Sequence, residues 1–401
     1  MQDLLLLIHR IPYPPNKGDK IRSYHLLKHL ARHYRVHLAT FVDDTDDWQY
    51  VPHVEALCAS SHFAAMKPLV ARAKSLTALL KNGSLSLAYY RDAGLARWVQ
   101  DTVAANRIER VLVFSSAMAQ YADPYRGARR VVDFVDVDSD KWRQYADKKS
   151  FPMSWLYRYE ADRLLRYERQ VARDYDASLF VSAPEAQLFR SLAPESSTKI
   201  GHFSNGVDTD YFSPHEAHAN PFGAGERALV FTGAMDYWPN VDAVQWFAGA
   251  VFPALRQRFT DLRFYIVGSR PSPAVQALAQ QAGVVVTGTV PDVRPYIAHA
   301  AVAVAPLRIA RGIQNKVLEA MAMATPVVVT PQALEGIDAV PGSELVLAAD
   351  DAAAFADAVA ALLDGHADAA AAIGRAARAK VQNRYSWSSN LACIGENLEC
   401  S

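Results

Sequence analysis

The stretch Arg308–Ala322, RIARGIQNKVLEAMA, carries the most information about the fold of this chain. It follows an apolar run that ends in Ala305 and Pro306, and it precedes a second apolar run, Val327–Thr330. Short β-branched runs on either side of a helical pattern predict a strand, a loop, a helix and a further strand. This order is typical of parallel α/β folds.

The loop in this stretch becomes a helix at Gly312, in a region that carries several cations. A helix N-terminus presents unpaired N–H groups and the positive end of the helix dipole, and both favour phosphate. Lys316 adds a cation there, and Glu319 is expected roughly two turns along the helix, where its carboxylate can accept hydrogen bonds from ribose hydroxyls. The stretch therefore predicts a site for a nucleoside diphosphate.

Short apolar strands alternate with helical patterns along the rest of the chain. One set begins at Leu4–Ile8, and a second begins afresh at Leu229–Thr232 after a polar segment with several glycines and prolines. We expect two doubly wound domains, with ligands beyond the carboxyl ends of their strands. The other expected strands are 36–41, 111–114, 131–135 and 178–182 in the first set, and 262–267, 284–287, 302–305 and 327–330 in the second.

Composition restricts the class of protein. The chain has 401 residues, more than one typical core needs, which also favours two domains. Lys plus Arg and Asp plus Glu are equal at 42 each, so no overall field attracts nucleic acid. The three cysteines lack metal-ligand spacing, and no apolar stretch reaches the roughly 18 residues needed to cross a bilayer. We therefore expect a cytoplasmic protein with no nucleic-acid partner.

Two long motifs resemble the family-4, GT-B-type retaining glycosyltransferases. The segment Lys316–Val328, KVLEAMAMATPVV, is similar to the signature helix of that family, and Phe203–Pro214, FSNGVDTDYFSP, is similar to the hinge between its domains. In the first half, Pro12–Lys20 and Val132–Asp138 are most similar to the sugar transferases associated with bacterial exopolysaccharide and exosortase systems.

The resemblance implies a GT-B fold of two Rossmann-like domains that face a central cleft. Residues 1–204 would form the acceptor-side domain, 205–225 the hinge and 226–384 the nucleotide-sugar-binding domain, with a helix at 385–401 packing back on the first. It also implies retaining, metal-independent transfer from a nucleotide-diphosphate sugar, without a cofactor. The implied acceptor is a lipid-linked or soluble oligosaccharide used in exopolysaccharide synthesis.

Glycines that follow strands are expected to hold the donor, because a missing side chain lets the backbone approach a diphosphate; the alternative for each is an ordinary tight turn. Many relatives carry an arginine and a lysine in the first such loop. This chain has Gly233-Ala-Met-Asp there, so Arg308 and Lys316 are expected to meet the phosphate charge, and both are predicted to act in catalysis. The implied donor-binding residues are Gly18, Gly233, Gly268, Gly288, Val290, Arg311, Gly312, Ile313, Gln314, Asn315, Lys316 and Glu319.

One position departs from the family pattern. The usual motif has two glutamates separated by seven residues, and the position eight residues before Glu319 holds Arg311. The first glutamate contacts the donor sugar in relatives, so the backbone amides at Gly312 and Ile313 and the Gln314 side chain are expected to replace it. The departure motivates one alternative, a catalytically silent nucleotide-sugar-binding protein of a biosynthetic complex. A GT-B nucleotide-sugar epimerase is a second alternative, and the lack of a clear acid/base pair counts against it.

The first domain is expected to supply acids to the reaction. Relatives often carry a histidine after the fifth strand, and the corresponding segment here holds Asp133, Asp136, Asp138 and Asp140 instead. Asp136 is the first candidate to orient the sugar or the acceptor hydroxyl, and Asp133 is the second. A divalent-ion site and a solvated strand end are the alternatives. By resemblance, a loop with Asn16, Lys17 and Asp19 contributes on the acceptor side.

Cationic and aromatic residues interleave between residues 141 and 173. Such a surface suits anionic lipid headgroups or a polyprenyl-diphosphate glycolipid, which makes the inner face of a membrane a candidate partner. Several acids in the same segment partly neutralise it, so a solvated helix is the alternative. The cations are Lys141, Arg143, Lys148, Lys149, Arg158, Arg163, Arg166, Arg169 and Arg173, and the apolar side chains are Phe151, Met153, Trp155, Leu156, Tyr157 and Tyr159.

Overall fold

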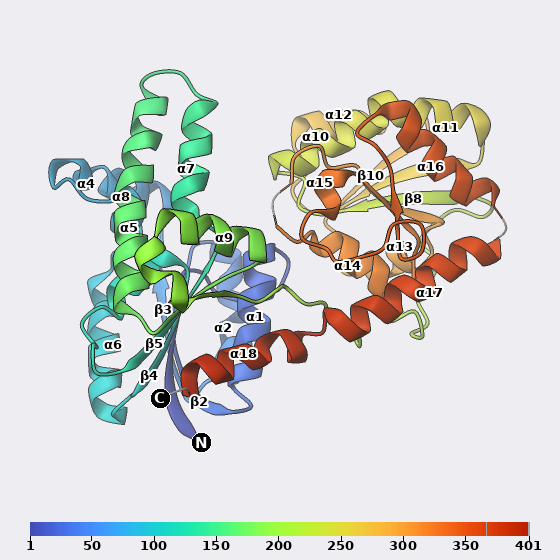
Figure 1. Ribbon diagram of the computed structural model, residues 1–401. Helices are drawn as coiled ribbons and strands as arrows, with labels where there is room; N and C mark the ends of the chain where they lie inside the picture. Colours follow the sequence, from blue (N-terminus) through green and yellow to red (C-terminus); the bar gives the residue numbers. More distant parts are fainter. Residues whose placement is uncertain (311, 366, 400–401) are drawn as a thin grey trace. The chain divides into compact units, whose positions relative to one another are not determined.

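The computed structural model describes residues 1–310, 312–365 and 367–399 (Figure 1). Two compact units divide the chain: Met1–Ser204 together with Leu391–Ser401, and Asn205–Asn390. Each unit has its own parallel sheet with helices packed against it.

The first unit is built on a seven-stranded parallel sheet in the order β3-β2-β1-β4-β5-β6-β7. The central strand β1 is apolar and buried from Leu4 to Ile8, as expected where helices cover both faces of a parallel sheet. The strands are β1 (Gln2–Ile8), β2 (Tyr34–Val42), β3 (Ser60–Ala65), β4 (Arg110–Phe114), β5 (Arg129–Val135), β6 (Ala177–Phe180) and β7 (Ile200–His202).

Helices of the first unit include a hairpin of α7 and α8, which lie side by side beyond the sheet (Figure 1). The α-helices are α1 (Gly18–Leu30), α2 (Val51–Glu55), α3 (Pro68–Ser75), α4 (Thr77–Leu80), α5 (Leu85–Tyr89), α6 (Ala93–Asn106), α7 (Asp138–Asp147), α8 (Met153–Asp174), α9 (Ala183–Leu192) and α18 (Trp387–Glu399), which enters this unit at Leu391. Short 3-10 turns are η1 (Thr45–Tyr50), η2 (Ser116–Tyr121) and η3 (Pro194–Lys199).

The second unit repeats the architecture on a six-stranded parallel sheet in the order β10-β9-β8-β11-β12-β13. Its strands are β8 (Arg227–Thr232), β9 (Leu262–Val267), β10 (Val284–Gly288), β11 (Val302–Ala305), β12 (Val327–Val329) and β13 (Val346–Leu347). Its helices are α10 (Trp238–Trp246), α11 (Phe252–Arg258), α12 (Pro273–Ala277), α13 (Arg294–Ala298), α14 (Asn315–Ala322), α15 (Pro331–Leu334), α16 (Ala352–Asp364) and α17 (Ala367–Arg384), with a π turn η4 (Phe247–Val251) and a 3-10 turn η5 (Leu278–Gln280).

Every strand expected from the sequence is present, and the differences lie at the ends. Two expected strands stop early because their last residues cap the next helix: Ser182 accepts from the Glu185 N–H, and Thr330 accepts from the Ala333 N–H. The expected loop at residues 12–20 stops at Lys17, because α1 begins at Gly18. The strands β3, β7 and β13 were not expected, since β3 is mostly half-exposed and the other two have three residues or fewer.

Close backbone packing explains one glycine after Ser204. Val207 donates its N–H to the Tyr385 carbonyl at 2.8 Å, so this segment lies against the residues that follow α17. A Cβ on Gly206 would meet the Trp387 backbone nitrogen at 2.8 Å. Only glycine allows that approach.

Candidate functional site

The glycine loops of the second unit meet at the carboxyl ends of three neighbouring strands. Gly233 follows β8 and donates its N–H to the Val267 carbonyl at 3.1 Å, and Gly268 follows β9 and donates to the Gly288 carbonyl at 3.2 Å. A Cβ on Gly268, whose φ is +155°, would lie 1.7 Å from the Gly233 carbonyl oxygen. The first two loops therefore pack main chain against main chain, without a side chain at Gly233 or Gly268. A phosphate site requires such access to the backbone.

We expect Gly268→Ala to destabilise the chain by about 1–3 kcal/mol, because the added methyl group forces the first two loops apart. Urea unfolding measures the loss. Gly249→Ala is the matched control, since a Cβ there meets no atom within 4 Å. Equal stability of the two variants would contradict the stacked arrangement.

Lys316, in the first turn of α14, reaches the first glycine loop. Its Nζ donates to Asn240 Oδ1 at 3.0 Å and lies 5.1 Å from the centroid of the Phe231 ring. A Cβ on Gly233 would be 3.5 Å from the Lys316 Cε. Burial lowers the pKa of Lys316 to about 8, against a weaker opposing effect of Glu319. Among the described residues no carboxylate lies within ion-pair distance of this ammonium, so an anion bound here would stabilise its charge.

Glu319 lies on the same side of α14 as Lys316, three residues further on. Because α14 begins at Asn315, the carboxylate is about one turn into the helix, not the two turns expected from the sequence. Burial raises the pKa of Glu319 to about 7, and the Lys316 charge only partly opposes this. One short helix thus carries both the cation and the carboxylate, and the cation lies beside the first glycine loop.

The loop before α14 is shaped by its backbone. Gly312 has a φ of +64°, and the Ile313 side chain is buried in the core of the unit, so Ile313 can offer a ligand only its main chain. Gln314 donates its Nε2 to the Gly312 carbonyl at 3.1 Å, and Asn315 Oδ1 accepts from Asn205 Nδ2 at 3.4 Å. Arg311, the position that departs from the family pattern, lies outside the described residues.

Arg308 is engaged elsewhere. Its guanidinium forms a bidentate pair with Asp242 on α10, at 3.1 Å and 2.6 Å. Binding phosphate would require Arg308 to leave this partner. Val290 packs beside a cluster that includes Phe222 and Tyr265, which is compatible with its predicted place under a base.

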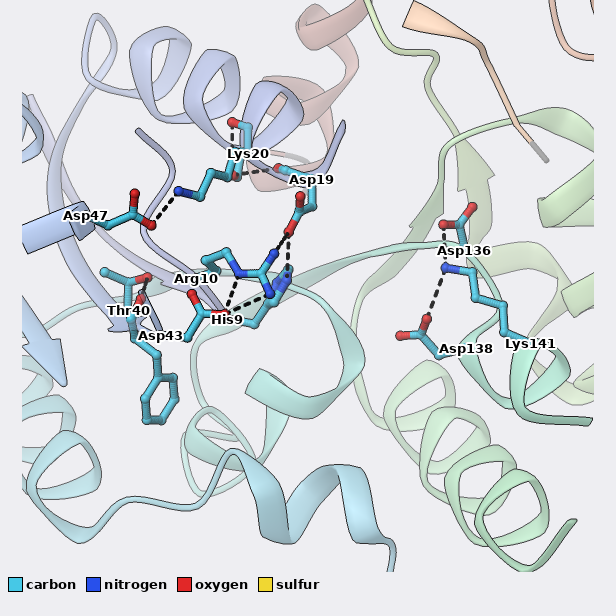
Figure 2. A network of polar contacts seen from close by, with 12 residues as sticks. His9, Arg10, Asp19, Lys20, Thr40, Asp43, Asp47, Asp136, Asp138 and Lys141 are labelled. Atoms are coloured by element: carbon cyan, nitrogen blue, oxygen red, sulfur yellow. Dashed lines mark hydrogen bonds and ion pairs between the residues drawn. The ribbon is translucent and has the colours of Figure 1, made fainter. Parts of the chain in front are cut away.

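The first unit also gathers polar side chains at strand ends (Figure 2). Arg10, just after β1, binds Asp19 of α1 at 3.0 Å and Asp43, just after β2, at 2.9 Å. His9 Nε2 lies 3.4 Å from the same Asp19 carboxylate. Burial alone would raise the pKa of Asp19, but the contacts with His9 and Arg10 outweigh it and hold that pKa well below its ordinary value.

The predicted acceptor-side loop borders this network. Asn16 is exposed, Lys17 is the N-cap residue of α1, and a Cβ on Gly18 would meet no atom within 4 Å. Gly18 is therefore the first residue of a helix with open space beside it. Lys20 is buried and donates to Asp47 at 2.6 Å, which ties the start of α1 to the turn η1.

Asp136 is half-buried beside the start of α7 and shares a lysine with Asp138 (Figure 2). Lys141 Nζ lies 2.7 Å from Asp136 and 3.3 Å from Asp138. Burial would lower the pKa of Lys141, but the two carboxylates outweigh it and raise that pKa above its ordinary value. The Lys141 ammonium thus lies between the Asp136 and Asp138 carboxylates. The described residues contain no group of three His, Cys, Asp or Glu that could hold a metal ion.

Buried carboxylates hold the loop that carries Asp136. The loop turns at Val135, a non-glycine residue with a φ of +69°. Three alternate N–H groups of this loop each donate to a carboxylate from a different element: Val135 to Asp133 at 3.1 Å, Val137 to Glu185 at 2.9 Å and Ser139 to Glu168 at 3.3 Å. The arrangement fixes the loop and leaves Asp136 and Asp138 on its other side with Lys141.

Asp133 cannot reach a substrate in this structure. It is 0% exposed, and Arg22 of α1 donates to both of its carboxylate oxygens, at 2.7 Å and 3.1 Å. The Arg22 guanidinium also stacks 3.6 Å from the centroid of the Phe203 ring and donates to the Phe203 carbonyl. We therefore replace the predicted catalytic role of Asp133 by a positioning role within the first unit.

The sequence did not point to His9, Arg10 and Asp43 as members of these networks. His9 and Arg10 are the first two residues after β1, and Asp43 directly follows β2. Ligands of doubly wound sheets bind beyond the carboxyl ends of the strands. Polar residues immediately after each expected strand were thus the available signal.

The second unit is similar to a known protein family. Residues 226–365 match the family model of the group 1 glycosyl transferases. This match lies within the second unit. The chain has no match among curated protein sequences. No helix of the described residues is long and apolar enough to cross a membrane.

Solved structures with the same fold align with nearly all of this chain. Sucrose-phosphate synthase from Thermosynechococcus elongatus is 18% identical, with a TM-score of 0.69 over 99% of this chain and 98% of that one. A glycosyltransferase from Rickettsia africae is 16% identical, with a TM-score of 0.68 over 100% and 99% of the two chains. Anabaena HepE in complex with UDP-glucose is 14% identical, with a TM-score of 0.66 over 100% of both chains. The expected GT-B fold is confirmed.

Proposed function

We propose that this chain is a glycosyltransferase that uses a nucleoside-diphosphate sugar as its donor and binds it on the second unit. The observation that carries the proposal is the position of Lys316, whose partly buried ammonium lies beside the first glycine loop. Glu319 lies one turn further along α14. Lys316 and the first amides of α14 bind the diphosphate, and Glu319 binds the ribose hydroxyls. The complexes of Anabaena HepE with UDP, with UDP and glucose together, and with UDP-glucose support this donor class.

The reaction that fits this site is transfer with retention of the anomeric configuration. The bond between the anomeric carbon and the phosphate oxygen breaks, and the acceptor oxygen bonds to the same face of that carbon. The acceptor proton passes to the departing phosphate oxygen, so no strong protein base and no metal ion are needed. Negative charge grows on that phosphate in the transition state, and the preorganised Lys316 and helix amides stabilise it.

We place Asp136 in the first unit as the residue that orients a sugar or acceptor hydroxyl. Its carboxylate is half-buried, is held by Lys141 at 2.7 Å and is carried by a loop fixed through three buried carboxylates. Such fixed geometry suits a group that positions a substrate hydroxyl. Asn16, Lys17 and Asp19 are proposed on the acceptor side of the same unit.

The acceptor we propose is a lipid-linked glycan in the assembly of an exopolysaccharide. The cationic and aromatic hairpin of α7 and α8 supports an anionic, membrane-borne acceptor. A solved structure with the same fold, WaaG, is described as involved in lipopolysaccharide biosynthesis, at 14% identity and a TM-score of 0.65.

Thermal unfolding with UDP-, GDP-, ADP- and dTDP-sugars tests the donor site. A ligand present at a hundred times its dissociation constant stabilises the folded state by about 2.7 kcal/mol, so one nucleotide class is expected to raise the melting temperature. Glu319→Gln is expected to remove most of that rise. Donor binding without transfer to any acceptor would favour a silent binding protein, and no rise with any nucleotide would overturn the assigned site.

Donor binding is expected to be strongest between about pH 7 and 8. Glu319 has a pKa raised to about 7, and protonation below it removes the acceptor of the ribose hydroxyls. Lys316 has a pKa lowered to about 8, and deprotonation above it removes the phosphate-binding charge. Calorimetric titration with the donor sugar from acid to alkaline pH measures the fall in affinity on both sides of this range. In Glu319→Gln only the fall on the acid side is expected to disappear. An affinity of the unchanged protein that does not vary with pH would contradict these assignments.

A further inference from the structure

Two segments of the first unit leave large apolar side chains in solvent. One is residues 67–82, which form α3 and α4, and the other is residues 148–158, at the turn from α7 into α8. Isolated exposed apolar side chains are ordinary, but clusters mark interaction sites. The exposed fractions are 79% for Leu69, 47% for Val70, 50% for Leu76, 90% for Leu80, 80% for Phe151, 40% for Met153 and 54% for Trp155.

Hydrogen bonds hold the end of the first segment beside the first half of α8. Tyr159 of α8 donates its hydroxyl to the Gly83 carbonyl at 3.2 Å, and Arg163 donates its Nε to Asn82 at 2.9 Å. The buried Glu160 carboxylate accepts from the Ser84 hydroxyl at 2.7 Å. The turn that follows Leu80 is thus bound to α8 about one turn beyond Trp155, whose ring lies 5.8 Å from that of Tyr159. We call residues 67–82 and 148–158 together the α4–α8 face.

The α4–α8 face carries charge of one sign. Residues 67–82 contain four cations and residues 148–158 contain three, and neither segment contains a carboxylate. The flanking acids Asp147 and Asp162 each lie near an arginine, at 3.4 Å from Arg158 and 3.8 Å from Arg143. The seven cations are Lys67, Arg72, Lys74, Lys81, Lys148, Lys149 and Arg158, and all are exposed.

We propose that the α4–α8 face docks on the surface of an anionic phospholipid bilayer. Short helices that combine exposed leucine, phenylalanine and tryptophan with lysine and arginine lie in the membrane interface, with apolar side chains at the acyl boundary and cations at the phosphates. A second copy of the chain is a poor occupant, because two faces that each carry seven cations and no carboxylate repel one another. The proposal deepens the proposed function. It rests on that function in one respect, because a bilayer would present the lipid-linked acceptor.

Vesicle co-sedimentation tests the proposal directly. The full chain is expected to bind phosphatidylcholine vesicles that contain phosphatidylglycerol, to bind pure phosphatidylcholine at least about tenfold more weakly, and to be released by salt. Leu80→Glu and Phe151→Glu each place a carboxylate on the face, and each is expected to lower the affinity about tenfold or more. Leu347→Glu, at a side chain 40% exposed in the second unit, is the matched control.

The outcomes separate this proposal from the donor site. All three variants change exposed side chains and are expected to keep the thermal shift with the donor sugar, so loss of vesicle binding alone supports the face. Unchanged vesicle binding in both variants of the face would overturn the proposal. So would a dimer of the full chain that Leu80→Glu converts to a monomer, because a second copy would then cover the face. Loss of the donor shift with vesicle binding intact would instead count against the donor site.

Discussion

Lys316→Met is expected to lower kcat for donor cleavage about a hundred- to a thousandfold. Removing one preorganised group that stabilises developing charge typically costs this much. Lys316 reaches the first of the stacked glycine loops, where its Nζ donates to Asn240 at 3.0 Å. The measurement is release of nucleoside diphosphate, under single-turnover conditions, from the donor sugar that raises the melting temperature.

Arg308→Met is the matched control for this experiment. Both cations are near α10, but Arg308 is already neutralised by Asp242 in a bidentate pair. Its loss is expected to change kcat much less than the loss of Lys316. If Arg308→Met lowered kcat more than Lys316→Met, Arg308 would have to leave Asp242 and bind the phosphate. Our assignment of Lys316 would then be wrong.

Arg22→Met is expected to destabilise the folded chain by about 3–5 kcal/mol. Both members of the Arg22–Asp133 pair are 0% exposed, and removing one leaves an uncompensated buried charge. Urea unfolding measures the loss. The double variant Arg22→Met, Asp133→Leu is expected to recover part of the stability, because it removes both charges together.

The same pair distinguishes positioning from catalysis. A positioning role predicts that Asp133→Asn lowers stability and leaves donor binding to the second unit unchanged. A catalytic role predicts that Asp133→Asn abolishes turnover while the unfolding curve stays in place. The second outcome would contradict the role that burial and Arg22 assign to Asp133.

Sequence patterns predicted the architecture, and they also nominated the residues at the centre of the proposed donor site. Apolar runs of strand length alternating with helical patterns predicted two parallel sheets, since side-chain periodicity is a local property of the backbone. The segment Arg308–Ala322 and the apolar run before it predicted strand, loop and helix in the right order, and the segment contains both Lys316 and Glu319. These residues are three apart, so one helix is enough to bring them together.

Which polar side chains a substrate can reach depends on the tertiary structure and could not be predicted from the sequence. Asp133 and Asp136 are three residues apart and equivalent in the sequence, yet one is enclosed by Arg22, which is 111 residues away, and the other is half-buried beside Lys141. Arg308 is likewise taken by Asp242, which is 66 residues away. Burial and pairing depend on residues far apart along the chain. A local pattern can therefore nominate a carboxylate or a guanidinium, but the packing of distant elements determines whether it meets a substrate or a partner.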